Sequence, residues 1–75
     1  MPKLPSVSGK AAIKAFAGVG FEVVRKAGSH HVMKRDGHPN LLTVPVHGNK
    51  DVANGTLRAL ISAAGLTIEE FVALL

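Results

Sequence analysis

The sequence contains no cysteine and only five acidic residues among its 75 residues. The lack of cysteine excludes a disulfide framework, a thiolate metal site and a thiol nucleophile, and it suits a cytoplasmic protein. No uninterrupted apolar run is long enough to cross a bilayer. The first ten residues, MPKLPSVSGK, lack the apolar stretch of a secretory signal. We therefore expect a cytoplasmic protein with no membrane association.

The scarcity of acidic residues leaves a net charge of +4 and a pI of about 10.0. A basic protein attracts polyanions through counterion release, and nucleic acid is the commonest polyanion. Basic charge can also serve solubility alone, so charge does not decide between these two roles. Hydrophobic residues make up 47% of the chain, which is typical of a globular protein. A chain this short has no room for a second core, so we expect one domain over residues 1–75.

The first predicted element is a helix of about three turns over residues 9–19. Ser8 is a good N-cap residue, and Gly20 is the expected left-handed residue at the end. Ile13, Phe16 and Ala17 recur at helical spacing and predict one buried stripe.

Three β-rich segments follow, separated by turn-forming residues. Turns are expected at residues 27–29 and 36–40, so the second and third strands should form a hairpin. Pro45 cannot donate to a ladder, which places that end of the third strand at a sheet edge or terminus. The predicted strands span residues 21–26, 30–35 and 41–46.

A second helix is predicted over residues 56–64, with Gly65 closing it. Thr67 and Glu70 match a capping box that starts a short third helix carrying Phe71. The order is α-β-β-β-α with a terminal helix, which predicts an α+β fold. Both main helices should pack on one face of a three-stranded antiparallel sheet. The opposite sheet face, or the helix edge beside it, is left for a partner.

The four histidines are the natural candidates for acid–base chemistry, because imidazole exchanges protons near neutral pH. His30 and His31 are adjacent on a predicted strand, so only one of them can face a given site. His30 follows a Gly28-Ser29 turn, where backbone amides can approach a ligand closely. His38 is expected to be an exposed residue of a hairpin tip. Each histidine could instead have no chemical role.

His47 opens a loop that leads to the second helix, whose N-terminus would suit a phosphate. The alternative is that Asn54 or Thr56 is an ordinary N-cap and His47 an ordinary loop residue.

The sequence offers no recognisable cofactor or metal site. No two histidines have the spacing that puts them on one helix face, and acidic ligands are scarce. Neither a P-loop nor a G-x-G-x-x-G motif is present. We therefore expect no metal and no small-molecule cofactor.

An ordered set of motifs over about residues 7–71 resembles the HicA (YcfA-like) family of type II toxin–antitoxin systems. The motifs are Ser8-Gly9-Lys10, Gly20-Phe21, Arg25, Gly28-Ser29-His30-His31, Thr43-Val44-Pro45-Val46-His47, Gly55-Thr56-Leu57-Arg58 and Ala64-Gly65-Leu66.

The resemblance implies a fold like the double-stranded-RNA-binding domain and one HicA-like toxin domain over residues 1–75. It also implies mRNA cleavage without the ribosome, and neutralisation by a HicB-type antitoxin. The catalytic histidine of the family's Gly-Ser-His turn corresponds to His30. Two positions depart from the family. The loop over residues 51–54 is poorer in lysine, and Met33 stands where an aromatic residue is frequent, which weakens any base-stacking role for that strand.

Metal-free RNA cleavage uses the 2′-hydroxyl as an internal nucleophile and needs proton transfer together with cations on the phosphate. His30 is the predicted proton-transfer residue, and Ser29 with its turn amides is predicted to steady a phosphate oxygen. The predicted cationic groove consists of Lys10, Arg25, Lys26 and Lys34. Two other readings remain open: a non-catalytic double-stranded-RNA-binding module, and a protein that acts only by pairing with another chain.

Overall fold

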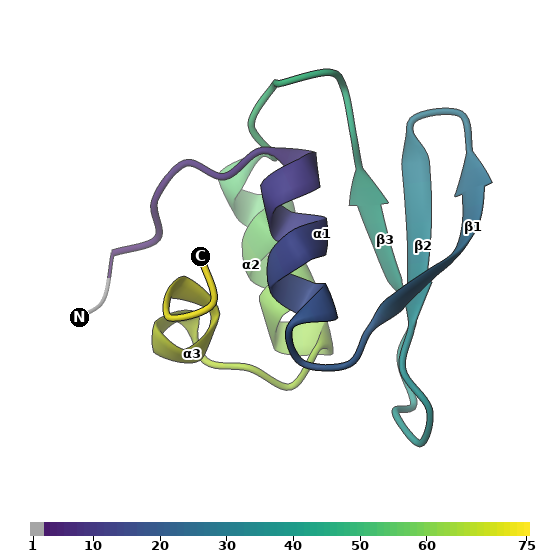
Figure 1. Cartoon of the computed structure of the whole chain (residues 1–75). Helices are drawn as coiled ribbons and strands as arrows, with labels where there is room; N and C mark the ends of the chain where they lie inside the picture. The colour runs from purple at the N-terminus through teal and green to yellow at the C-terminus, as the bar shows by residue number, and fades with distance from the viewer. Residues whose placement is uncertain (1–2) are drawn as a thin grey trace.

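The computed structural model describes residues 3–75, so residues 1–2 of the predicted domain lie outside the described residues (Figure 1). The predicted α+β fold with a three-stranded antiparallel sheet is confirmed. No helix within residues 3–75 is both long and apolar enough to span a membrane. The elements, in chain order, are α1 (Gly9–Ala17), β1 (Glu22–Ala27), β2 (His30–Lys34), β3 (Leu42–Pro45), α2 (Asn54–Ala63) and α3 (Ile68–Val72).

Helix α1 begins at the predicted cap, because the backbone N–H of Ala11 donates to Ser8 Oγ over 3.1 Å. Gly20 has the predicted left-handed conformation, with φ of +99°. The predicted stripe is wrong at Ala17, which is exposed, and Ile13 is only half-buried. The buried face consists of Phe16 and three small residues, which let the helix lie close to the sheet: Gly9, Ala12 and Ala15.

The sheet has the order β1-β2-β3, with β2 in the centre. Residues directly opposite each other on neighbouring strands share a face of the sheet. Met33 lies opposite Leu42, and His31 lies opposite Val44. Met33, Leu42 and Val44 are fully buried. These residues face the helices, since α1 and α2 both cover the same side of the sheet (Figure 1). No helix within residues 3–75 lies on the other side of the sheet, which is called the uncovered face (Figure 1).

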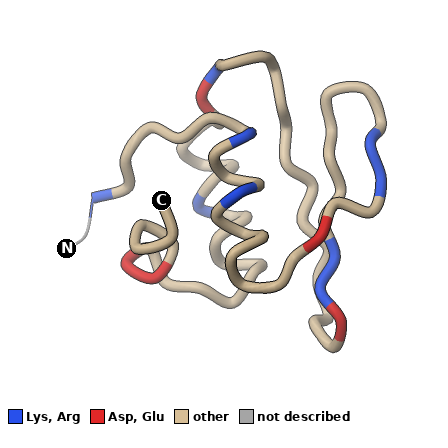
Figure 2. Tube along the Cα trace, in the orientation of Figure 1, with Lys and Arg blue, Asp and Glu red and all other residues tan. Residues whose placement is uncertain are grey.

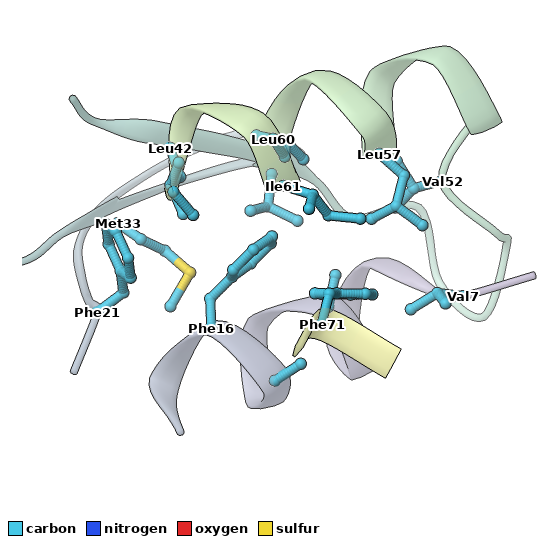
Figure 3. Close-up of a cluster of buried hydrophobic side chains, with 14 of the residues drawn as sticks. Val7, Phe16, Phe21, Met33, Leu42, Val52, Leu57, Leu60, Ile61 and Phe71 are labelled. Atoms are coloured by element: carbon cyan, nitrogen blue, oxygen red, sulfur yellow. The ribbon is translucent and has the colours of Figure 1, made fainter. Parts of the chain in front are cut away.

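The core joins the sheet to all three helices around a cluster of phenylalanines (Figure 3). The ring centroids of Phe16 and Phe71 are 5.2 Å apart, and those of Phe16 and Phe21 are 6.3 Å apart. Met33 belongs to the same cluster with no exposed surface. An aromatic residue at position 33 would therefore pack into the core, so the expected link between this position and base stacking is wrong.

Helix α2 begins two residues earlier than predicted, at Asn54. Ala53 occupies the N-cap, so neither Asn54 nor Thr56 caps the helix, and Asn54 Oδ1 instead accepts a hydrogen bond from Arg58 Nε over 2.8 Å. The predicted apolar residues of this helix are all buried: Leu57, Leu60, Ile61 and Ala64.

Helix α3 begins with the predicted capping box. The backbone N–H of Glu70 donates to Thr67 Oγ1 over 3.1 Å, and the N–H of Thr67 donates to Glu70 Oε1 over 2.9 Å. The helix packs on α2 and places the fully buried Phe71 in the core.

The segment that precedes α1 also belongs to the core. Leu4 and Val7 are buried, and the Val7 carbonyl accepts a hydrogen bond from the N–H of Val52 over 2.8 Å. A bridge between Ser8 and Asp51 extends this contact. The segment therefore fastens the long loop between β3 and α2, which sequence periodicity did not indicate.

Candidate functional site

His30 is the first residue of β2 and follows a two-residue hairpin turn. Gly28 has φ of +59°, and no non-glycine residue within residues 3–75 has a positive φ. A positive φ at the first turn residue alone is the pattern of a type II′ turn, in which glycine is strongly favoured. The His30 side chain is exposed. Because His31 shares the covered face with Val44, His30 points to the uncovered face of the sheet.

The turn before His30 is fixed to the end of β3. The N–H of Val46 donates to the Ser29 carbonyl over 2.6 Å, and His30 lies directly opposite Pro45. Pro45 is the last residue of an edge strand, as predicted. Two hairpin segments therefore hold the His30 backbone, while its imidazole makes no hydrogen bond to another described residue.

Helix α1 begins at this same end of the molecule. Gly9 is buried against Pro45 and Val46, and a Cβ added at Gly9 would overlap the Pro45 carbonyl oxygen. Figure 1 shows the N-termini of α1 and α2, the β1–β2 turn and the end of β3 all at the upper end of the fold. The close approach at Gly9 places Lys10 at the same end of the sheet as His30, but on α1, which covers the opposite face.

Replacing Gly9 with alanine is expected to destabilise the protein by about 1–3 kcal/mol, because rigid backbone atoms occupy the space of the new methyl group. Thermal or urea unfolding measures this loss. Gly55→Ala is the matched control, since nothing lies within 4 Å of a Cβ built there and alanine suits a helix. Equal stability of the two variants would show that α1 does not approach β3 as closely as described.

The predicted RNA-binding residues divide between the two ends of the sheet. Arg25 lies opposite Val32 and therefore shares the uncovered face with His30, whereas Lys26 lies opposite His31 and shares the covered face with it. The side chains of Arg25 and Lys26 are exposed, as is that of Lys10, and Ser29 is half-buried. Lys34 is at the other end of β2, four residues or roughly 13 Å from His30 along the strand. Figure 2 shows basic residues on α1, on β1 and just before α2.

The other three histidines have different surroundings. His31 is half-buried on the covered face, which confirms that the two adjacent histidines face opposite sides. His47 is exposed in the loop after β3, where its carbonyl accepts a hydrogen bond from the N–H of Lys50 over 3.0 Å. Among these residues, His30 alone lies on a strand with an exposed side chain.

The expectation that His38 is an exposed residue of a hairpin tip is wrong. Its Nε2 donates a hydrogen bond to the Ala63 carbonyl over 2.8 Å, and its ring meets that of Phe21 edge-on at 5.2 Å. Asn40 Nδ2 donates to the same carbonyl over 3.0 Å. These contacts fasten the β2–β3 hairpin to the C-terminal end of α2, so His38 has a structural role.

No three side chains of the types that ligate metals gather within residues 3–75. The candidate site thus consists of one exposed histidine, a glycine-serine turn and nearby cations.

A three-stranded sheet with helices on one face and an exposed histidine on a basic hairpin defines a small α+β protein suited to an anionic partner. The family model described as HicA toxin of bacterial toxin–antitoxin systems matches residues 9–66. The chain therefore belongs to the HicA toxin family and is a toxin of a bacterial toxin–antitoxin system. The search of curated proteins returned no match.

Proposed function

We propose that this HicA toxin is an mRNA interferase, a ribosome-independent endoribonuclease that works in the cytoplasm without a metal ion. His30 is its proton-transfer residue. The observation that carries the proposal is the position of His30, which is exposed, follows a turn bonded to the end of β3, and shares its face of the hairpin with Arg25. Its imidazole makes no hydrogen bond to another residue of the described range 3–75, so none has to break when a proton is transferred.

The proposed RNA cleavage needs proton transfer, positive charge near the phosphate and hydrogen-bond donors to its oxygens. The 2′-hydroxyl attacks the adjacent phosphorus, a new bond forms to O2′, and the bond to the 5′-oxygen of the next nucleotide breaks. One proton leaves the attacking hydroxyl and one reaches the leaving oxygen, and His30 serves one or both transfers. Arg25, on the same face as His30, offsets the charge that develops on the phosphate, while Lys26 and Lys10 at the same end of the sheet attract the RNA backbone at longer range. The Ser29 side chain with its turn amides steadies a non-bridging oxygen.

A HicB-type antitoxin is the proposed protein partner. An antitoxin that neutralises this chain has to cover His30 or the cations around it, so an acidic contact surface is expected. Co-purification of the toxin with the product of a neighbouring open reading frame tests this pairing. RNA that competes with the antitoxin for the toxin would support a shared surface.

Incubation of the purified protein with single-stranded RNA in EDTA tests the proposed activity. We expect cleavage at an unchanged rate after chelation, because the proposed proton transfer uses a histidine and no step uses a metal ion. Loss of cleavage in EDTA, restored by a divalent cation, would contradict metal independence. Stable, salt-sensitive RNA binding by a folded protein without cleavage would instead indicate a double-stranded-RNA-binding module.

A further inference from the structure

A cavity of about 290 Å³ lies at the end of the β1–β2 hairpin that is opposite to His30. It is formed by the loop after α1, the start of β1 and the end of β2. In Figure 2, acidic and basic segments of the trace meet in this region. The residues that give the cavity its chemistry are Gly20, Glu22, Val24, Lys34, Arg35 and Asp36.

The cavity continues the surface on which His30 lies. Glu22 is directly opposite Lys34 on the neighbouring strand, and positions 30, 32 and 34 alternate onto the uncovered face of β2. Lys34 is roughly 13 Å from His30 along the strand. An RNA strand that crosses His30 along the hairpin therefore reaches this cavity with a nucleotide other than the one that is cleaved.

The side chains of the cavity suit a nucleobase better than a phosphate. Two carboxylates, from Glu22 and Asp36, repel phosphate but accept hydrogen bonds from the amino groups of bases. The Arg35 side chain lies along Gly20, with Nε 3.6 Å from a Cβ built there, and guanidinium planes stack on bases. Val24, which is 56% exposed, adds an apolar contact.

We propose that this cavity binds one amino-bearing base of the RNA substrate, namely adenine, cytosine or guanine, and so contributes to the choice of cleavage site. The proposal rests on the proposed ribonuclease function. The carboxylates accept from the base amino group, Arg35 stacks on the base, and Lys34 contacts the adjoining phosphate. Uracil has no amino group, and its single N3–H donor is flanked by two carbonyl oxygens that repel a carboxylate, so it suits the cavity less well.

Neutralising Glu22 separates base recognition from general electrostatics, because the two predict opposite signs. A surface carboxylate that only repels RNA weakens the binding of every sequence, so its removal strengthens binding to all of them. A carboxylate that accepts a hydrogen bond from a base amino group strengthens the binding of amino-bearing sequences only, so its removal weakens the binding of those sequences. Glu22→Gln keeps the size of the side chain and changes its charge.

The experiment uses the full chain with His30→Ala, which prevents cleavage during the titration. Fluorescent oligo(A), oligo(C), oligo(G) and oligo(U) are titrated with this protein, with the added Glu22→Gln variant and with Glu69→Gln as control. Glu69 is exposed on α3, away from the cavity. We expect at least one amino-bearing oligomer to bind about five- to tenfold more tightly than oligo(U), and Glu22→Gln to abolish that difference. Glu69→Gln should preserve it.

Equal affinities for all four oligomers would overturn the proposal, as would tighter binding of all four after Glu22→Gln. Either result together with RNA cleavage by the parent protein would reject the base-binding cavity and leave the ribonuclease assignment standing. Base preference that disappears with Glu22→Gln would support the cavity even if the parent protein failed to cleave RNA, and that failure would count against the proposed function alone.

Discussion

Replacing His30 with alanine is expected to lower the rate of RNA cleavage by about 10²- to 10⁴-fold, which is the usual contribution of one proton-transfer group. The fold should survive the change, because the His30 side chain is exposed and makes no hydrogen bond to another described residue. The Val46–Ser29 hydrogen bond that fixes the turn involves backbone atoms only and is retained. Cleavage rates of labelled RNA and thermal unfolding of both proteins measure these two expectations.

His47→Ala is the matched control for the His30 variant. Both side chains are exposed, but His47 lies in the loop after β3, whereas His30 lies on the hairpin with Arg25 and Lys26. We expect the His47 variant to retain most of the parent activity. A folded His30→Ala protein that cuts RNA at the parent rate would refute the assignment of proton transfer to His30. Loss of cleavage in the His47→Ala variant alone would assign that role to His47 instead.

Replacing Phe71 with alanine is expected to destabilise the protein by about 3–5 kcal/mol, the usual cost of removing a buried phenylalanine side chain. Phe71 has no exposed surface and packs on Phe16, with ring centroids 5.2 Å apart. A chain of 75 residues has a total stability of about 4–11 kcal/mol, at 0.05–0.15 kcal/mol per residue. The loss is thus a large part of the total, although Phe71 lies beyond the matched residues 9–66.

Urea unfolding of the Phe71 variant measures this effect, with Leu75→Ala as its control. Leu75 is a large apolar residue of the same C-terminal segment but is 53% exposed, so its truncation should change stability by less than about 0.5 kcal/mol. A Phe71→Ala protein as stable as the Leu75 variant would show that α3 does not belong to the core in solution.

Local sequence signals predicted the parts of the fold that depend on neighbouring residues. The Ser8 cap and the Thr67–Glu70 capping box each need only residues three apart, and both are present as expected. Alternation along residues 41–46 placed Leu42 and Val44 on the buried face. The start of α2 was predicted wrongly. This helix begins without a side-chain cap, so no residue type in the sequence marks its first turn.

Long-range contacts account for the remaining errors. His38 occurs among turn-forming residues, and nothing local indicates that the carbonyl of Ala63, 25 residues away, accepts its hydrogen bond. Leu4, Val7 and Val52 lie in segments without a regular apolar period, yet all three are buried. For the candidate site, strand alternation separated His30 from His31. The cavity around Glu22 requires the α1–β1 loop and the end of β2 to meet, which strand patterns do not specify.

The backbone contacts around His30 have a consequence for the amount of active toxin in a cell. Ser29 is held by Val46, Gly9 lies against Pro45, and Val7 is bonded to Val52, so segments from both halves of the sequence assemble the site. No single hairpin can form it alone. A nascent or partly degraded chain is therefore expected to lack the proposed activity, which requires the whole molecule to fold. A variant that lowers the folded fraction is expected to lower the proposed activity per molecule in the same proportion.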